Sequence, residues 1–435
     1  MMSLLFYQFK LGWRSLKQAP LVTGLTLLVL SLGASLLAVN LILLHIMYAD
    51  PIPEKSEQLF HVSLNTWQSE DPFNEPFHLL TYQDASQILN SAIPDQGMIS
   101  YRASVYTKNS DSNSDKMHAA SVRAFSGDFF AMTMAPFQWG SGWDIHLESQ
   151  STPEHVVISD RLNQLLFNGE NSLGKSLTIE NKSFTIIGIL KPWHLKPKFY
   201  HVNDGQTYAP TEDIYLPLET ALNNDFMPSS MTISLDYWSK MSETRNSNVY
   251  FLQSWVQLND LSQKQAFQDY LDTYSAHLKE QGKHPLSINN QLNDVKAWMA
   301  INQVVDSNIQ AFTLATFLFL VVCLFNATSL LLVKQTKAQF ETSLRRALGV
   351  SRRQLYIESV TESFLIGSIA GIIAIFLSYL FLIVASKLLP RMAHIIEYDP
   401  SSFFISFCVT LSSSLLIAFY PVYSTYRHSI ALQIK

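Results

Sequence analysis

The stretch that decides the fold class is SNIQAFTLATFLFLVVCLFNATSLLLV, residues 307–333, which contains no acidic or basic side chain. A helix of about 20 apolar residues crosses the hydrocarbon core of a bilayer, so this stretch is long enough to span a membrane. Residues 21–48, 363–386 and 401–426 lack charged side chains in the same way. The sequence therefore predicts an integral membrane protein with four transmembrane helices.

The composition excludes a soluble multidomain enzyme and a nucleic-acid-binding protein. Only 15% of the 435 residues are charged and 48% are hydrophobic, which is too apolar for the soluble class. Residues 50–306 carry 17 Lys/Arg and 30 Asp/Glu (17 − 30 = −13), whereas the remainder carries 13 and 5 (13 − 5 = +8). An acidic block of this size would repel nucleic acid. The two cysteines, Cys323 and Cys408, both lie in predicted spans and cannot cross-link this block.

The flanking charges predict the orientation in the membrane. Residues 1–20 form an amphipathic segment with three basic side chains, and no acid occurs before Asp50, which indicates a cytoplasmic N-terminus retained as an anchor. Residues 334–362 carry six basic side chains against three acids and are also predicted to be cytoplasmic. Residues 50–306 and the short loop 387–400 are then external, and the tail 427–435 is internal.

Residues 50–306 alternate between strand-like and helix-like patterns. β-Branched or alternating runs predict strands at 59–64, 99–107, 118–125, 156–159, 176–190, 213–216 and 248–258. Apolar side chains at helical spacing predict helices at 82–89 and 263–280. The sequence therefore predicts one large mixed α/β domain inserted between the first and second transmembrane helices.

Two connections in this domain have patterns of their own. Residues 191–213 contain Pro and Gly without any period, which predicts an excursion between subdomains. From Ile288 onward, apolar residues at helical spacing predict a helix that continues without a breaker into the second span. Such a helix would connect the external domain rigidly to the membrane.

Residues 169–176, GENSLGKS, match the phosphate-loop pattern G-x-x-x-x-G-K-[ST]. A working phosphate loop leaves a strand and enters a helix, but residues 177–187 predict a β-hairpin with an Asn181–Lys182 turn. We expect an ordinary surface turn here. The sequence shows no metal-ligand spacing. The predicted spans contain no Asp, Glu, Lys or Arg to drive ion-coupled transport, and His45 lies at the outer end of the first span, where we expect it at the interface.

The loop 334–362 carries the most information about function. Phe340, Leu344, Ala347 and Leu348 line one face of a short predicted helix, and Gly349 occupies the position of a left-handed C-terminal cap. A capping box at 351–354 opens the next helix. Two readings stay open at this point: a basic helix that meets anionic lipid, or a docking element for a cytoplasmic partner.

This loop also carries a family resemblance. ETSLRRALGVSRR at 341–353, followed by Glu358, Glu362, Gly367 and Gly371, resembles the signature between the second and third spans of FtsX/MacB-type ABC transporter permeases. Thr342-Ser343 stands where the family commonly has Ile-Gly. The segments FSGDFF (125–130), VVIS (156–159), GKSL (174–177) and FTIIGI (184–189) resemble the MacB-type periplasmic core domain, and DPIP (50–53) and IAL (430–432) also fit.

The resemblance implies an ATP-driven machine in which this chain is not the enzyme. A separate ABC ATPase subunit would bind ATP and Mg²⁺, push on the loop, and move the periplasmic domain through the helices. The residues that the resemblance assigns to ATPase coupling are Phe340, Glu341, Leu344, Arg345, Arg346, Ala347, Leu348 and Gly349. It assigns no catalytic, cofactor or metal residue to this chain.

The resemblance also implies partners and a role. The expected partners are the ATPase, a second permease copy or paralogue, a periplasmic membrane-fusion adaptor with an outer-membrane duct, and membrane lipid. The implied function is export of a peptide, antibiotic or other amphiphile at the inner membrane. Two alternatives remain open: a lipoprotein-releasing permease, and a regulatory complex that activates a cell-wall hydrolase or senses a peptide without transport.

Overall fold

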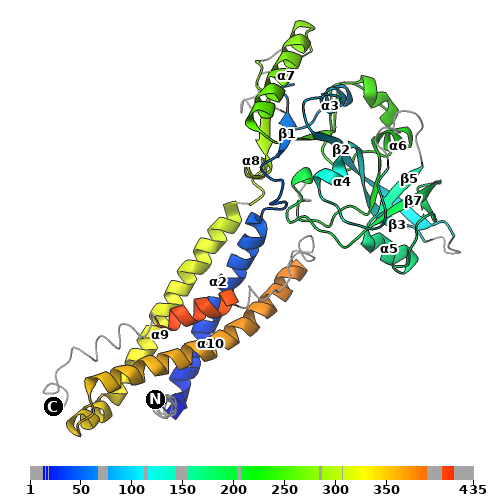
Figure 1. The fold of residues 1–435 in the computed structure, drawn as a ribbon. Coiled ribbons are helices and arrows are strands. Elements are labelled where there is room, and N and C mark those ends of the chain that lie inside the picture. Colours follow the sequence, from blue (N-terminus) through cyan, green and yellow to red (C-terminus); the bar gives the residue numbers. More distant parts are fainter. Residues whose placement is uncertain are drawn as a thin grey trace. The chain divides into compact units, whose positions relative to one another are not determined.

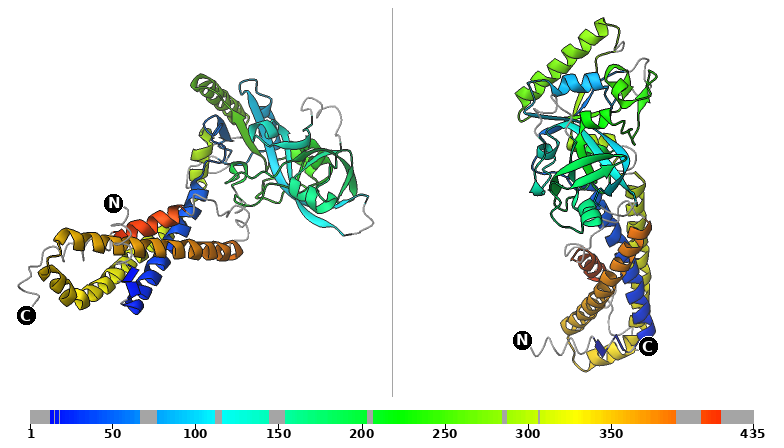
Figure 2. Two further views of the ribbon diagram at one scale, coloured as in Figure 1. Left: turned by 60° about the horizontal axis from the view of Figure 1, so that its bottom comes forward. Right: turned by 90° about the vertical axis from the view of Figure 1, so that its right-hand side faces the viewer.

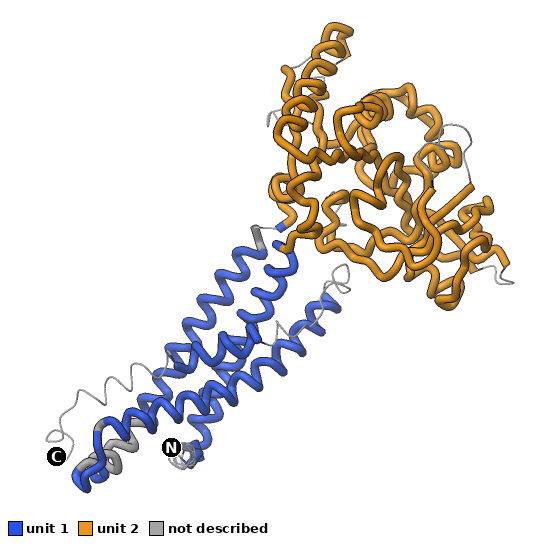
Figure 3. The backbone as a smooth tube through the Cα atoms, viewed as in Figure 1, with its two compact units in different colours: residues 1–48, 305–435 blue, residues 49–304 orange. Residues whose placement is uncertain are grey.

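The computed structural model describes residues 13–14, 16–17, 19–66, 77–111, 116–143, 154–202, 207–283, 287–305, 307–388 and 404–415. The chain divides into two compact units (Figure 3). We call residues 1–48 and 305–435 the helical unit, and residues 49–304 the α/β unit.

The helical unit contains α2 (Pro20–Tyr48), α9 (Ser307–Ala347) and α10 (Arg352–Leu388) (Figure 1). Among the described residues, these three helices are long and apolar enough to cross a membrane. The predictions at 21–48, 307–333 and 363–386 are therefore confirmed as apolar helices. For the fourth span, predicted at 401–426, the structure describes only the helix Phe404–Leu415, and the rest lies outside the described residues.

Small residues allow the helices of this unit to approach closely. α2 packs against both α9 and α10 (Figure 2). A Cβ added at Gly33 of α2 would lie only 3.0 Å from Cys323 Sγ of α9. On α10, a Cβ at Gly367 or Gly371 would collide with Ser414 or Phe407 of the helix Phe404–Leu415. Such contacts are typical of helix packing in lipid, where close van der Waals fit replaces the hydrophobic effect.

The short helix predicted within 334–362 is the last part of α9 rather than a separate element. No Gly or Pro occurs between Ser307 and Ala347, so nothing interrupts the hydrogen-bond ladder until Gly349.

The α/β unit is built on one mixed sheet. Among the described residues, ten strands join in the order β12-β1-β11-β2-β3-β8-β5-β7-β4, and β6 pairs with both β2 and β7. The strands are β1 (Leu59–Ser63), β2 (Gln96–Asn109), β3 (His118–Gly127), β4 (Phe137–Gly140), β5 (His155–Ile158), β6 (Ser176–Ile179), β7 (Lys182–Leu190), β8 (Ile214–Pro217), β11 (Gln253–Gln257) and β12 (Gln291–Asp294). A separate pair joins β9 (Ile233–Ser234) to β10 (Val249–Tyr250).

Helices cover both faces of this sheet, so alternate residues of each strand enter different cores. Val156 and Ile158 lie in the first core, whereas Val157 between them lies in the second. The first core is covered by α3 (Tyr82–Leu89), α5 (Asp160–Phe167), α6 (Leu218–Asn223) and α7 (Leu261–Glu280). The second core is covered by α4 (Phe129–Met132), α8 (Val295–Ile301) and the 3₁₀ helix η2 (Phe199–His201). A second 3₁₀ helix, η4 (Met241–Asn246), lies against α3 and α6.

The two predicted helices and most of the predicted strands are present, with small shifts at their ends. The prediction of one strand at 248–258 was wrong, because β10 belongs to the separate pair and β11 to the main sheet. α3 occupies the predicted residues, while α7 begins at Leu261 because the Asp260 side chain accepts a hydrogen bond from Gln263 N at 2.7 Å. The prediction of an Asn181–Lys182 turn was wrong by one residue. Ile179 pairs with Lys182, so Glu180 and Asn181 form the turn, and Glu180 adopts a left-handed φ of 54°.

Residues 191–213 do not connect two subdomains, because both sides of this segment belong to the same sheet. Its apolar side chains pack on the second face of that sheet, where Phe199 and Tyr200 are fully buried. This segment therefore lacks a hydrophobic period because it forms an irregular layer over the second face of the sheet.

The predicted continuous helix from Ile288 into the second span was wrong. Residues 291–294 form β12, which pairs with β1, and α8 then ends at Ile301. Asn302 Nδ2 donates to Trp298 O at 2.8 Å, and Gln303 has a left-handed φ of 48°. These local interactions end the helix before α9 begins.

Candidate functional site

The turn between α9 and α10 is closed by a glycine cap. Gly349 has φ +99°, a conformation that costs side-chain-bearing residues about 1–2 kcal/mol. Val350 N donates to Arg345 O at 3.1 Å, which is the long hydrogen bond of a Schellman motif. The predicted C-terminal cap is therefore confirmed.

A capping box opens α10 directly after this turn. Gln354 N donates to Ser351 Oγ at 3.3 Å, and Ser351 N donates to Gln354 Oε1 at 3.1 Å. Each side chain thus satisfies a backbone donor of the other residue. Only four residues separate the ends of α9 and α10, and three of them, Leu348, Val350 and Ser351, are held by local hydrogen bonds.

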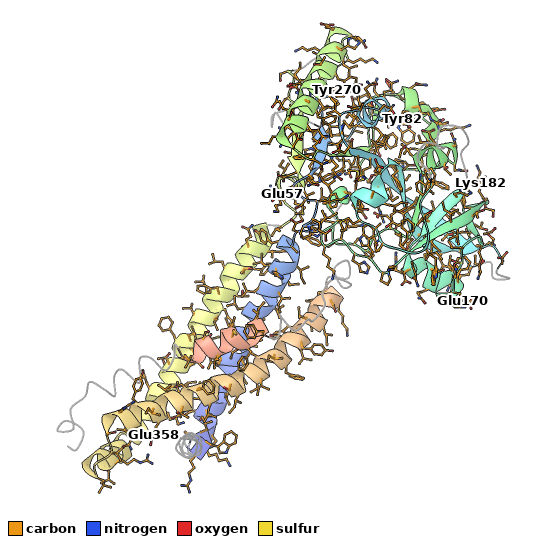
Figure 4. The ribbon with its side chains drawn as sticks, viewed as in Figure 1. Glu57, Tyr82, Glu170, Lys182, Tyr270 and Glu358 are labelled. Carbon is orange, nitrogen blue, oxygen red and sulfur yellow. The ribbon has the colours of Figure 1, made fainter. Side chains whose placement is uncertain are left out.

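Ion pairs connect the two helices on either side of the turn. Lys334 of α9 pairs with Glu362 of α10, and Arg345 Nη1 lies 3.5 Å from Glu358 Oε2 (Figure 4 labels Glu358). The Lys334 side chain is 10% exposed, whereas that of Arg345 is 40% exposed. An exposed pair contributes about 1 kcal/mol or less, so the Arg345–Glu358 contact adds little stability, whereas the more buried Lys334–Glu362 pair is screened less by solvent. These pairs were not predicted from the sequence, although Glu358 and Glu362 share one face of α10 at i, i+4.

Apolar side chains lie exposed at the end of this helix pair. Leu344 is 52% exposed and Leu348 is 78% exposed, and Ala347 and Gly349 beside them are also exposed. Basic residues surround them in the sequence. Exposed leucines on a charged helix end are typical of a contact surface for another protein. We call Leu344, Ala347, Leu348 and Gly349 the turn surface.

Three of the predicted coupling residues have side chains that the structure does not describe. Phe340, Glu341 and Arg346 belong to α9, but their side chains lie outside the described residues. The structure therefore brings together Leu344, Ala347, Leu348 and Gly349 at the turn, and places Arg345 in an ion pair with α10.

The opposite end of α9 follows α8 in the sequence after five residues, and α8 is anchored by one tryptophan. The Trp298 side chain is fully buried and its Nε1 donates to Phe199 O at 3.1 Å. Its ring stacks on His61, with centroids 3.5 Å apart. Burial, and then the neighbouring His78, lowers the pKa of His61 well below its ordinary value. A neutral imidazole is therefore held against the indole.

The second core also holds a buried ionic cluster. Arg123 Nη2 lies 2.8 Å from Glu212 Oε1, Lys198 Nζ lies 3.4 Å from the same oxygen, and Tyr200 donates to Glu212 Oε2 at 2.9 Å. Burial alone would raise the pKa of Glu212, but the attraction of Arg123 and Lys198 lowers it well below its ordinary value. The sequence alone does not predict this cluster, because its members come from β3, from η2 and the residue before it, and from the residue pair before β8.

Among the described residues, the phosphate-loop match does not have the structure of a nucleotide-binding loop, and the acidic residues do not form a metal site. The segment 169–176 runs from the end of α5 to the start of β6, so its order is helix, turn, strand, the reverse of a phosphate loop (Figure 4 labels Glu170, which lies within the segment). No group of three or more His, Cys, Asp or Glu side chains in the described part of the chain could hold a metal ion.

Two family profiles cover most of the chain. The profile described as MacB-like periplasmic core domain matches residues 23–274, and the profile described as FtsX-like permease C-terminal matches residues 313–430. The first of these alone spans more than half of the 435 residues. The chain belongs to the FtsX/MacB-type family of ABC transporter permeases. In this permease, the second profile includes the turn surface and both ion pairs between α9 and α10.

Solved structures resemble the α/β unit of the permease only distantly. The periplasmic region of MacB from Actinobacillus actinomycetemcomitans is 14% identical with a TM-score of 0.38, covering 60% of this chain and 98% of that one. The extracellular domain of the noncanonic ABC-type transporter YknZ from Gram-positive bacteria is 14% identical with a TM-score of 0.35, covering 54% and 100%. None of the curated proteins matches the chain significantly. The family and the apolar helices make this chain a membrane protein with an extracytoplasmic-type domain.

Proposed function

We propose that this permease transmits the motion of a separate cytoplasmic ATPase to its α/β unit, and that this motion drives export of a peptide, antibiotic or other amphiphile. The observation that carries the proposal is the turn surface, which exposes Leu344 and Leu348 at the end of a 41-residue helix. Family membership supports the ATPase partner.

The length and continuity of α9 support a mechanical role. At 1.5 Å per residue, its 41 residues extend over about 60 Å, twice the thickness of the hydrocarbon core. No Gly or Pro weakens this helix. Because α9 continues from the candidate span Ile309–Lys334 to the turn surface, a displacement there would move the span as well.

The proposed orientation follows from charge. Residues 334–362 are the most basic loop and would lie in the cytoplasm with both termini, while residues 50–306 carry a net charge of 17 − 30 = −13 and would lie outside. The turn surface then faces the compartment that holds ATP. We further propose that two permease subunits act together, either identical or paralogous.

Co-purification of the ATPase tests the contact at the turn surface. Leu344→Asp and Leu348→Asp should each reduce ATPase recovery from native membranes, because a central apolar contact is worth about 2 kcal/mol or more and a buried unpaired carboxylate costs further. Leu261→Asp is the matched control, since Leu261 is 84% exposed on α7 of the α/β unit. Full ATPase recovery and unchanged hydrolysis in both turn variants, with normal membrane insertion, would refute the contact.

A deletion strain distinguishes export from the two alternatives. Loss of a small peptide or amphiphile from the medium supports export. Retention of lipoproteins in the inner membrane instead supports lipoprotein release. Altered cell-wall hydrolysis with neither change supports regulation, and would overturn the export proposal.

A further inference from the structure

Two arginines oppose each other in the middle of the sheet. Arg102 of β2 and Arg123 of β3 are direct partners in the antiparallel register, so their side chains emerge on the same face. Like charges at directly opposed positions destabilise a strand pair. Some other group must therefore offset this repulsion.

The ion pairs in this region leave a surplus of positive charge. Arg123 and Lys198 share the single carboxylate of Glu212, and all three side chains are buried. Arg102 Nη1 donates to Ser229 Oγ at 3.2 Å, and Arg102 has no ion pair with any described residue. The buried cations Arg123 and Lys198 with the one carboxylate leave a formal charge of 2 − 1 = +1, and the half-buried Arg102 adds a further positive charge beside them. Buried charge is normally compensated by charge of the opposite sign.

A small cavity lies beside these arginines. It has a volume of about 10 Å³ and is lined by Ser100, Arg102, Arg123, His201 and Gln253, among other residues. Arg102 Nε, Arg123 Nε, His201 Nε2 and Gln253 Oε1 are all buried without a hydrogen-bond partner among the described residues. The side chains of Arg123, His201 and Gln253 are at least 95% buried. Buried polar atoms are rarely left unpaired, so their meeting at one cavity indicates a bound group.

We propose that this cavity holds one monatomic anion, which is chloride in ordinary saline. The volume admits a single atom-sized group. Both arginine Nε–H groups donate hydrogen bonds, and His201 Nε2 donates in one of its neutral tautomers. The Gln253 amide offers its NH₂ group when its oxygen and nitrogen are exchanged, an assignment that the hydrogen-bond network decides. Water could accept these hydrogen bonds, but only an anion also offsets the positive charge.

The anion would join four segments that meet at the second core. Its partners come from β2, β3, β11 and η2. η2 also provides Phe199 O, the acceptor of the Trp298 hydrogen bond that anchors α8. Binding would therefore stiffen the support of the helix that precedes α9.

Thermal unfolding of the purified full-length chain tests the proposal. The chain is heated at constant ionic strength and pH, in mixtures of sodium chloride with sodium gluconate, whose anion is too large for the cavity. The expected result is a saturable rise of a few degrees in Tm with chloride. In crystals soaked with bromide, an anomalous peak should lie within hydrogen-bond distance of Arg102 Nε and Arg123 Nε.

The variant Arg102→Met distinguishes a bound anion from a bound water molecule in the cavity. This variant should lose the chloride response and be more stable than the wild type in gluconate, because it removes one of two opposed charges. Lys182→Met is the matched control, since it removes an exposed cation at the start of β7 and should keep the chloride response. Equal Tm values of the wild type in both salts, or no bromide peak at the cavity, would mean that the site holds water only and would overturn the proposal.

Discussion

The indole of Trp298 lies flat on the imidazole of His61, with centroids 3.5 Å apart and planes 11° from parallel. The ring of Trp255 stands perpendicular to the indole at 6.2 Å. Trp298 belongs to α8, the last helix of the α/β unit before α9, and His61 belongs to β1 in the sheet. In the sequence, Trp298 lies nine positions before the first residue of α9 (307 − 298).

Replacement of Trp298 should weaken the attachment of α8. Trp298→Ala removes a fully buried indole and should cost about 3–5 kcal/mol, whereas Trp298→Phe retains a stacking ring and should cost less. The measurement is the Tm of the purified chain by circular dichroism. Tyr237→Ala, at a 93% exposed position, serves as the control and should change stability by less than about 0.5 kcal/mol. An unchanged Tm in Trp298→Ala would contradict the anchoring role.

Acidification below neutral pH should destabilise the α/β unit through its buried histidines. Burial, and then His78, lowers the pKa of His61; burial, and then Arg123 and Lys198, lowers the pKa of His201. In the unfolded chain both histidines protonate near pH 6.5, so the unfolded state binds more protons below that pH. Stability is therefore fully present above about pH 6.5 and is lost as the pH falls, by up to about 1.4 kcal/mol per pH unit for each histidine.

The measurement of this pH effect is Tm between pH 7.5 and pH 5. His61→Phe should flatten the slope because the ring can still stack on Trp298 but binds no proton. His277→Gln, at an exposed position on α7, should leave the slope as it is. A wild-type Tm that is constant over this range would refute the prediction.

Close packing at Gly33 should be required for the contact between α2 and α9. A Cβ there would lie 3.0 Å from Cys323 Sγ and 3.1 Å from Leu320 Cδ1, so Gly33→Leu should force the helices apart and reduce the yield of monodisperse protein. At Gly24 of the same helix no atom lies within 4 Å of an added Cβ, so Gly24→Leu is the control. Equal size-exclusion profiles and Tm values for both variants would show that this contact is dispensable.

Thiol labelling should show that the α/β unit and the turn surface lie on opposite sides of the membrane. In a Cys323→Ala, Cys408→Ala background, Tyr237→Cys should react with an impermeant reagent once the outer membrane is permeabilised, and Leu348→Cys should not. The native side chains are 93% and 78% exposed, so access is not limited by burial. Labelling of both sites, or of neither, would contradict the proposed orientation.

The phosphate-loop match at residues 169–176 should not bind nucleotide. Lys175 Nζ lies 3.7 Å from Glu170 Oε2 in an exposed pair, and such pairs contribute about 1 kcal/mol or less. Lys175→Ala should therefore leave complex ATPase activity within about twofold, as should Lys182→Ala in the adjacent hairpin. Loss of nucleotide binding by correctly folded Lys175→Ala alone would overturn this reading.

The sequence by itself determined the features that depend on short-range physics. A charge-free stretch such as 307–333 must form a helix in lipid because its backbone has no other hydrogen-bond partners there. Gly349 and Ser351 specify the turn because only neighbouring residues take part in their hydrogen bonds. The helix α3 and strands such as β3 follow from local periodicity in the same way.

Tertiary structure alone decided the contacts between distant residues. β8 pairs parallel with β3, His61 meets Trp298 across 237 positions of sequence (298 − 61), and Arg102 faces Arg123 in one register. The helical periodicity after Ile288 predicted a helix there and did not indicate that residues 291–294 would pair with β1 as a strand. Strand pairing, unlike a cap or an apolar span, depends on which distant partner is available, and local pattern carries no information about that choice.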